Sequence, residues 1–197
     1  MNPRELSKDF WNNRYVEKNT GWDMGTVSPP LKVYFDQLQN KKAKILIPGC
    51  GNSHEAEYLH DSGFKDVFVL DYSPLAIDNF RKRVPSFPVA NAICEDFFQH
   101  NGKYDLIVEQ TFFCAIDPAL RSEYARHMHE LLNKNGKLTG LLFTDTQGQE
   151  GPPYGGTKEE YVSIFKSYFD MKVMETAYNS IEPRKGRELF MILAKKE

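Results

Sequence analysis

The chain has 197 residues, 41% of them hydrophobic, and its 25 Lys and Arg nearly balance 27 Asp and Glu, for a net charge of −2. A chain of this length can bury roughly 70% of its unfolded surface, so one domain over residues 1–197 is expected to fold without staples. The charge lacks the basic excess that nucleic acids and anionic membrane surfaces select, which argues against both partners.

Cysteine content and the N-terminal residues indicate the cellular compartment. The three cysteines, Cys50, Cys94 and Cys114, are odd in number and lack Cys-x-x-Cys spacing, which argues against a disulfide framework and against a zinc site. The N-terminus has no apolar signal segment, and no run approaches the roughly 18 apolar residues of a membrane-spanning helix. We therefore expect a cytoplasmic protein with no bound metal. We also expect a monomer, because no exposed apolar stripe in the sequence demands a partner.

The first 40 residues combine a helix with an aromatic loop. Leu6, Phe10, Trp11 and Arg14 recur at helical spacing, which predicts a helix over residues 3–18. The loop that follows, "NTGWDMGTVSPPL", is rich in Gly and Pro yet contains Trp22. Because a solvated linker seldom contains tryptophan, we expect this segment to pack against the core formed by residues 41–197.

Strands and helices alternate after residue 43. Apolar, β-branched runs predict strands over residues 43–48, 66–72, 89–94, 104–110 and 137–145. Helices are predicted between them over residues 53–63, 73–84 and 117–136. Their terminal signals are the N-caps Ser53, Ser73 and Asp117 and the glycines Gly63 and Gly136. Such alternation is typical of a parallel sheet with helices on both faces.

The C-terminal residues follow another pattern. A capping box, Thr157 to Glu160, opens a helix over residues 157–165. Two strand-like runs follow, over residues 170–178 and 188–196, with too few residues between them for a helical crossover. We therefore expect a Rossmann-like, seven-stranded, mostly parallel sheet that ends in an antiparallel hairpin. This ending is typical of class I S-adenosylmethionine (SAM) methyltransferases rather than of dehydrogenases.

The stretch "KILIPGCGNSHEAEYL" leads from the first of these strands through a Gly-rich turn into a helix, where open α/β sheets bind nucleotides. A Walker loop would need Gly-Lys-Ser or Gly-Lys-Thr, which is absent. A dinucleotide fingerprint would need a third glycine after Gly49 and Gly51, where the chain has His54. SAM carries no phosphate and needs only a close backbone turn, so the turn favours SAM.

Two carboxylates extend this interpretation. Asp71 ends the second predicted strand, where it can accept both ribose hydroxyls. Asp96, in "CEDFF", ends the third and can accept the adenine amino group, while Phe97 or Phe98 flanks the ring. Dehydrogenases share the first feature, so a nicotinamide-dependent oxidoreductase is the competing interpretation.

Cys50 lies between the two glycines of the turn, and two roles are considered for it. A catalytic cysteine would need a positioned basic partner, and His54 is the local candidate. We favour the other interpretation, in which Cys50 is a small residue in a turn that must approach the cofactor closely.

The segments "FWNNRYVEKNTGWDMG", "ILIPGCGNSHE", "LDYS", "DLIVEQTFFCAIDP", "EGPPY" and "SIEPRKGRE" resemble the thiopurine S-methyltransferase family, and within it the plant-type thiol and halide methyltransferases. The resemblance implies a class I methyltransferase in which residues 1–40 close over SAM. It implies cofactor contacts from Trp11, Tyr15, Trp22, Gly49, Asp71, Asp96 and Gln110, and Gly51 belongs to the same turn. Tyr15 and Gln110 stand where the plant pattern has Trp and Tyr, so a polar contact is the alternative to stacking there.

The implied reaction is methyl transfer from SAM to a thiol, hydrosulfide, thiocyanate or iodide, which leaves S-adenosylhomocysteine (SAH). A soft anion arrives already charged, so no strong base is required, and the sequence shows no nucleophile–base–acid set. A thiopurine-type enzyme for aromatic thiols and a non-catalytic SAM-binding module are the alternatives.

The acceptor is expected at the carboxyl ends of the strands. Tyr154 is the preferred contact, although it can instead anchor a flexible lid. Phe113 and its neighbour Phe112 can line an apolar slot or pack in the core. Arg184 and Lys185 can attract an anion or form a solvated turn. Glu109 can contact the cofactor's amino group or the substrate.

Overall fold

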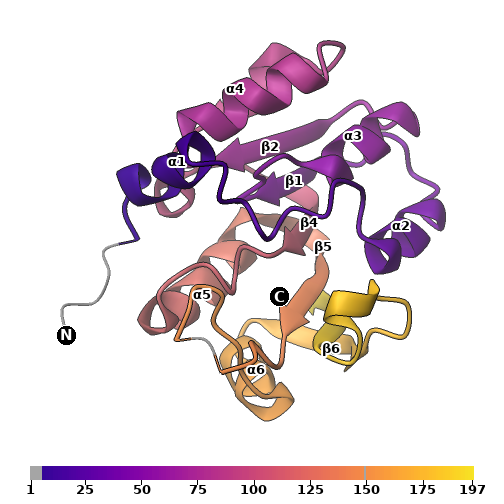
Figure 1. Cartoon of the computed structure of the whole chain (residues 1–197). Helices are drawn as coiled ribbons and strands as arrows, with labels where there is room; N and C mark the ends of the chain where they lie inside the picture. Colours follow the sequence, from indigo (N-terminus) through magenta and orange to yellow (C-terminus); the bar gives the residue numbers. More distant parts are fainter. Residues whose placement is uncertain (1–5, 149) are drawn as a thin grey trace.

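A computed structural model describes residues 6–148 and 150–197 (Figure 1). Within these described residues, seven strands form one sheet in the order β3-β2-β1-β4-β5-β7-β6. They are β1 (Ile45–Pro48), β2 (Val67–Asp71), β3 (Ala92–Cys94), β4 (Tyr104–Gln110), β5 (Leu132–Phe143), β6 (Phe169–Thr176) and β7 (Glu188–Lys195). Within this sheet β7 pairs antiparallel with β5 and β6, and the other pairs are parallel. The predicted mostly parallel sheet with an antiparallel C-terminal hairpin is confirmed.

Helices cover both faces of the sheet (Figure 1). The six α-helices of the described residues are α1 (Lys8–Val16), α2 (Pro29–Asp36), α3 (His54–Asp61), α4 (Pro74–Arg83), α5 (Arg121–Leu131) and α6 (Lys158–Phe165). Side chains alternate across each strand, so Ile45 and Ile47 of β1 face the layer of α2, α3 and α4, whereas Leu46 faces the layer of α5 and α6. Two apolar cores result, one on each side of the sheet.

Several predicted helix ends are confirmed. The Ser73 side chain accepts the amide of Ala76 at 3.2 Å and caps α4. Thr157 and Glu160 form the reciprocal capping box of α6. Gly63, with φ of +89°, follows the last turn of α3, a conformation that glycine adopts without steric cost.

Three predicted boundaries are wrong. Ser53 does not cap α3 because the preceding turn leaves it left-handed, with φ of 51°, and its side chain makes no capping hydrogen bond. Gly136 does not end a helix: α5 stops at Leu131, and Gly136 lies in β5, where the ladder to β4 is interrupted before Lys137. Residues Val89–Asn91 form a 3-10 turn ahead of β3 rather than its first half.

The N-terminal segment also differs from expectation. The predicted helix over residues 3–18 is shorter, as Lys8–Val16, and residues 3–5 lie outside the described residues. The predicted Gly/Pro loop ends in α2, whose first turn holds the prolines at the positions where a missing amide costs least. No helix in the described part is long and apolar enough to cross a bilayer.

The strand order sets the position of the site. The chain runs from β1 outward to β2 and β3, then returns to β4 on the other side of β1. Open α/β sheets bind ligands beyond the carboxyl ends of their strands at such a reversal. Gly49 follows β1, Asp71 ends β2 and Gln110 ends β4, so the candidate residues lie together there.

Candidate active site

A cavity of about 1150 Å³ lies at this edge of the sheet and extends from the N-terminal segment to the loop before β7. Ten of the residues proposed from the sequence line it: Trp11, Tyr15, Trp22, Gly49, Asp71, Asp96, Phe97, Phe98, Phe112 and Arg184. Ligand pockets commonly enclose about 300–1,000 Å³, so this cavity has room for a nucleoside cofactor and a second small molecule.

The Gly-rich turn has no space for side chains at its two glycines. A Cβ atom on Gly49 would lie 2.3 Å from the Phe112 ring, and one on Gly51 would lie 3.0 Å from the Tyr15 hydroxyl. Both glycines have positive φ angles, +57° and +53°. The turn therefore allows its backbone, the aromatic N-terminal segment and the loop after β4 to approach one another closely.

Asp71 connects this turn to the end of β2. One carboxylate oxygen accepts the amide of Gly51 and the other accepts the amide of Ser73, each at 2.8 Å. Burial raises the pKa of Asp71, while the hydrogen bonds to its carboxylate lower it. An ionised carboxylate has about four acceptor sites, so each oxygen keeps capacity for one ribose hydroxyl.

Asp96 and Phe97 line the cavity beyond Asp71. The Asp96 carboxylate accepts the amide of Phe98 at 3.0 Å, which fixes its direction. The Phe97 ring is buried and meets the Phe112 ring edge to face, with centroids 5.1 Å apart. An apolar wall next to a fixed carboxylate is the arrangement that a purine base with an amino group needs.

Three aromatic side chains of the N-terminal segment form the cavity's cover. The Trp22 ring meets both the Trp11 ring and the Tyr15 ring edge to face, each at a centroid distance of 5.8 Å. Burial, followed by the charge of Asp71, raises the pKa of Tyr15, so this residue is a neutral phenol. Aromatic faces of this kind attract a sulfonium cation.

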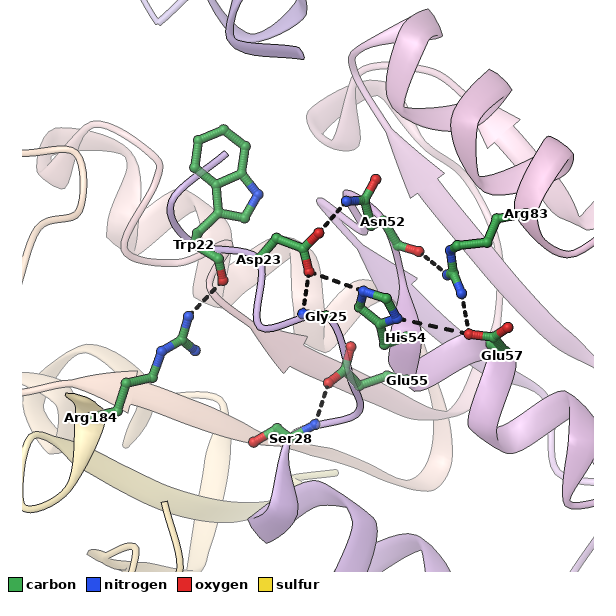
Figure 2. Close-up of polar contacts among 10 residues, drawn as sticks. All are labelled: Trp22, Asp23, Gly25, Ser28, Asn52, His54, Glu55, Glu57, Arg83 and Arg184. Atoms are coloured by element: carbon green, nitrogen blue, oxygen red, sulfur yellow. Dashed lines mark hydrogen bonds and ion pairs between the residues drawn. The ribbon is translucent and has the colours of Figure 1, made fainter. Parts of the chain in front are cut away.

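The cover is anchored at α3 and α4. Figure 2 shows Asp23 bonded to the Asn52 amide and, at 3.0 Å, to His54, while the amide of Ser28 donates to Glu55 at 2.9 Å. In α1, the Asn12 side chain accepts the Ser73 hydroxyl at 2.8 Å. Most of the residues that hold the cover thus belong to the Gly-rich turn and to the N-terminal ends of α3 and α4.

Cys50 has no basic partner among the residues that the structure describes. Burial and the Asp71 carboxylate raise the pKa of its thiol well above the usual range. The imidazole of His54 instead contacts Asp23 and, at 3.8 Å, Glu57. A neutral thiol without a base is unsuited to nucleophilic attack, which supports the interpretation of Cys50 as a small turn residue.

Gln110 and Glu109 end β4 and point to different surroundings. The Gln110 side-chain oxygen is buried without a hydrogen-bond partner among the described residues, and Gln110 lines a small pocket of about 40 Å³ with Gly49, Gly51 and Trp22. An orphaned acceptor beside the Gly-rich turn is suited to the polar end of a bound cofactor. Glu109 is fully buried, and its carboxylate accepts the amides of Phe112 and Phe113 and the hydroxyl of Tyr124.

Only some of the residues predicted to contact the acceptor line the cavity. Phe113 is 1% exposed in the core, and neither it nor Tyr154 is among the described residues that line the cavity. The Tyr154 backbone amide instead donates to Cys114 at 2.7 Å, and its carbonyl accepts Arg121. Arg184 does line the cavity and is 7% exposed, so the solvated-turn interpretation was wrong for this residue.

Five residues that line the cavity were not predicted from the sequence. Cys114, Phe143, Pro152, Pro153 and Arg187 also line it. In the "EGPPY" segment the sequence favours Tyr154 as the substrate contact. In the structure the two prolines of this segment, Pro152 and Pro153, line the cavity instead. Within the described residues, no three His, Cys, Asp or Glu side chains are grouped to hold a metal ion.

Known proteins resemble this chain in sequence and in fold. The sequence model of the family described as thiopurine S-methyltransferase matches residues 6–193. Thiocyanate methyltransferase 1 of Brassica oleracea is 31% identical over 193 residues, covering 94% of this chain and 84% of that protein. Thiopurine S-methyltransferase of Pseudomonas fluorescens is 28% identical, covering 86% of this chain and 87% of that protein.

A solved structure shows the same fold. The 1,6-didemethyltoxoflavin-N1-methyltransferase of Burkholderia thailandensis, crystallised with SAH, superposes with a TM-score of 0.74 at 15% identity, covering 96% of this chain and 87% of that one. The family match and the plant relative also confirm the resemblance that the sequence motifs indicate. The chain therefore belongs to the thiopurine S-methyltransferase family and is a SAM-dependent methyltransferase with the class I fold.

Proposed function

We propose that the chain methylates a small sulfur nucleophile or halide, such as hydrosulfide, a thiol, thiocyanate or iodide, with SAM as donor and SAH as product. The observation that carries this proposal is one cavity lined by two chemically different groups of residues, which we assign as its cofactor end and its acceptor end. We assign Asp71, Asp96 and the aromatic cover to the cofactor end, and Arg184 and Arg187 to the acceptor end.

The first end fits SAM. Asp71 would accept the ribose hydroxyls and Asp96 the adenine amino group, with Phe97 against the ring. The orphaned Gln110 oxygen and the glycine turn would receive the methionine portion. When bound, SAM supplies an electrophilic methyl group on a sulfonium. The rings of Trp11, Tyr15 and Trp22 each contribute roughly 0.5–2 kcal/mol toward holding such a cation, and they exclude water.

The second end fits a small anion. The guanidinium groups of Arg184 and Arg187 attract negative charge, and Cys114, Phe143 and the two prolines wall the cavity with apolar atoms. An anion that arrives charged needs no base, so the protein's task is alignment of the two reactants. Such alignment can supply up to about 7–11 kcal/mol of the rate enhancement.

An aromatic thiol of the thiopurine type is the second candidate acceptor. The cavity volume of about 1150 Å³ favours this alternative because it exceeds what SAM and a single small anion require. The bacterial relative at 28% identity is a thiopurine S-methyltransferase.

The decisive experiment is calorimetric titration with SAH, followed by methyl transfer assays with hydrosulfide, thiocyanate, iodide and a thiopurine. We expect micromolar SAH binding and turnover with the small anions at higher kcat/KM than with the thiopurine. The reverse ranking would favour the thiopurine-type enzyme. Binding without any turnover would contradict the proposed reaction, and absence of SAH binding would contradict the cofactor assignment.

We further infer a single-domain cytoplasmic monomer whose partners are small molecules rather than nucleic acid. The small net charge and the odd, unpatterned cysteines support this inference. Light scattering coupled to size exclusion would test it: the expected mass is 22.8 kDa, and twice that mass would contradict a monomer.

A further inference from the structure

Arg184 makes a contact that its place at the acceptor end does not require. Its guanidinium donates a hydrogen bond of 2.6 Å to the backbone carbonyl of Trp22, across 162 positions of sequence (Figure 2). A second nitrogen lies 3.4 Å from the carboxylate of Glu188, and the guanidinium lies 5.4 Å from the centroid of the Phe143 ring. Arg184 is therefore fixed in direction by β7 and by the end of β5.

This contact holds the aromatic cover from the side opposite its other anchors. Asp23 and Ser28 are tied to the turn and to α3, whereas Arg184 reaches Trp22 from the loop before β7 (Figure 2). Trp22 lies between these anchors, with its ring on the cavity and against Tyr15. A charge-assisted hydrogen bond to its carbonyl restrains the backbone that carries this ring.

We propose that Arg184 is a positioning residue for the cofactor, holding Trp22 closed over the SAM site from the acceptor end of the cavity. The inference rests on the proposed function, because it assumes that SAM occupies the space beneath Trp11, Tyr15 and Trp22. The side chain that faces the acceptor then also secures the cover of the cofactor. Weakening this hydrogen bond loosens cofactor binding, although the Arg184 side chain itself is assigned to the acceptor.

The chain offers a direct readout of this cover. It has two tryptophans, Trp11 and Trp22, and both belong to the cover, so their fluorescence reports on this segment. In a Trp11→Phe background, acrylamide quenching reports on Trp22 alone. We expect Arg184→Gln to raise the SAH dissociation constant about tenfold or more. We also expect it to increase quenching of Trp22 in the SAH complex at least twofold.

Two variants serve as controls. Arg184→Lys keeps a cation and a hydrogen-bond donor, so it should retain part of the SAH affinity and part of the protection of Trp22 from acrylamide. It provides the test if Arg184→Gln does not fold. Arg187→Gln alters a guanidinium that lines the same cavity but donates to the carbonyls of Asp145 and Pro183, outside the cover. It should change the KM for the acceptor while leaving Trp22 quenching and SAH affinity unchanged.

The outcomes separate this inference from the proposed function. If the unaltered protein binds SAH and Arg184→Gln binds it within twofold, the inference is wrong and the proposed function stands. Weaker SAH binding with unchanged Trp22 quenching would also overturn it, because Arg184 would then act without moving the cover. Failure of the unaltered protein to bind SAH would overturn the proposed function itself.

Discussion

Glu109, the residue before the last of β4, turns its carboxylate into the core rather than into the cavity. It accepts the amides of Phe112 and Phe113 at 2.7 and 2.9 Å, and the hydroxyl of Tyr124. These bonds fold the loop after β4 into a turn that begins at Thr111, whose φ is +57°. That turn places Phe112 against Gly49, so a buried carboxylate shapes the cavity without touching it.

The ionisation of Glu109 predicts how stability depends on pH. Burial raises the pKa of Glu109 to about 7 from an ordinary value of 4.5, despite the hydrogen bonds that lower it. Between these two pH values the folded protein binds more protons than the unfolded chain, so the free energy of unfolding falls as pH rises. We expect the Glu109 contribution to this fall to be about 3 kcal/mol, fully expressed above pH 7.

Urea denaturation at pH 5 and pH 8 would check this prediction in the unaltered protein and in Glu109→Gln. The variant should lose most of the difference between the two pH values. Burial also raises the pKa of Asp71, Glu55 and Glu188, which lowers stability in the same direction as pH rises, whereas burial lowers the pKa of His127, which acts in the opposite direction. An undiminished difference in Glu109→Gln would show that another group is responsible.

At the scale of residues, the sequence predicts positions that depend on local chain geometry. Gly49 and Asp71 directly follow or end apolar runs, so their place at the edge of the sheet can be derived from the pattern. Arg184 could be proposed only as charge near an acceptor, because its bond to Trp22 joins segments 162 positions apart. No sequence pattern identified Arg187 as a cavity residue. The sequence favoured Tyr154, whereas the two prolines before it line the cavity.

At the scale of elements, terminal signals succeed where the local backbone is ordinary. Ser73 and Thr157 cap helices as predicted because each has an extended backbone that directs its oxygen to the first turn. Ser53 fails because the Gly-rich turn forces it into the left-handed region. Gly136 fails because pairing with β4 begins at Leu132, so tertiary contacts override a helical pattern that continues further.

The capping box of α6 should contribute measurably to stability. The Thr157 hydroxyl accepts the amide of Glu160 at 3.1 Å, and the Glu160 carboxylate accepts the amide of Thr157 at 2.6 Å. We expect Thr157→Ala to lower the free energy of unfolding by about 1 kcal/mol and the Tm by about 2–4 °C.

Differential scanning calorimetry would measure this effect. Thr157→Ser preserves the hydroxyl and should remain within a few tenths of a kcal/mol of the unaltered protein. Equal destabilisation by both substitutions would place the contribution in packing of the Thr157 methyl group rather than in the cap.

At the scale of the molecule, the cover and the sheet meet through polar contacts spread over the chain. Asn12 contacts the start of α4, and Asp23 contacts the Gly-rich turn and α3. The Trp22 carbonyl accepts a hydrogen bond from Arg184, which lies in the loop before β7. The sequence predicts that residues 1–40 pack on the core, and the aromatic residues identify which part does so. It does not reveal these anchors, because each joins segments that are distant in sequence.

Such distributed anchoring predicts that the cover and the core unfold together when SAH is bound. A ligand that binds the folded state alone, present at 100 times its dissociation constant, raises the free energy of unfolding by about 2.7 kcal/mol. For a chain of this length that corresponds to a rise in Tm of roughly 5–11 °C.

Parallel thermal scans by tryptophan fluorescence and far-ultraviolet circular dichroism would test this expectation. Fluorescence follows the cover through Trp11 and Trp22, and dichroism follows the helices of the core. Coincident transitions that both shift upward with SAH would support a cover closed on the cofactor by all of its anchors. A fluorescence transition that precedes the dichroism transition in the presence of SAH would show that the cover opens independently, and the contacts of Asn12, Asp23 and Trp22 would then be too weak to join it to the core.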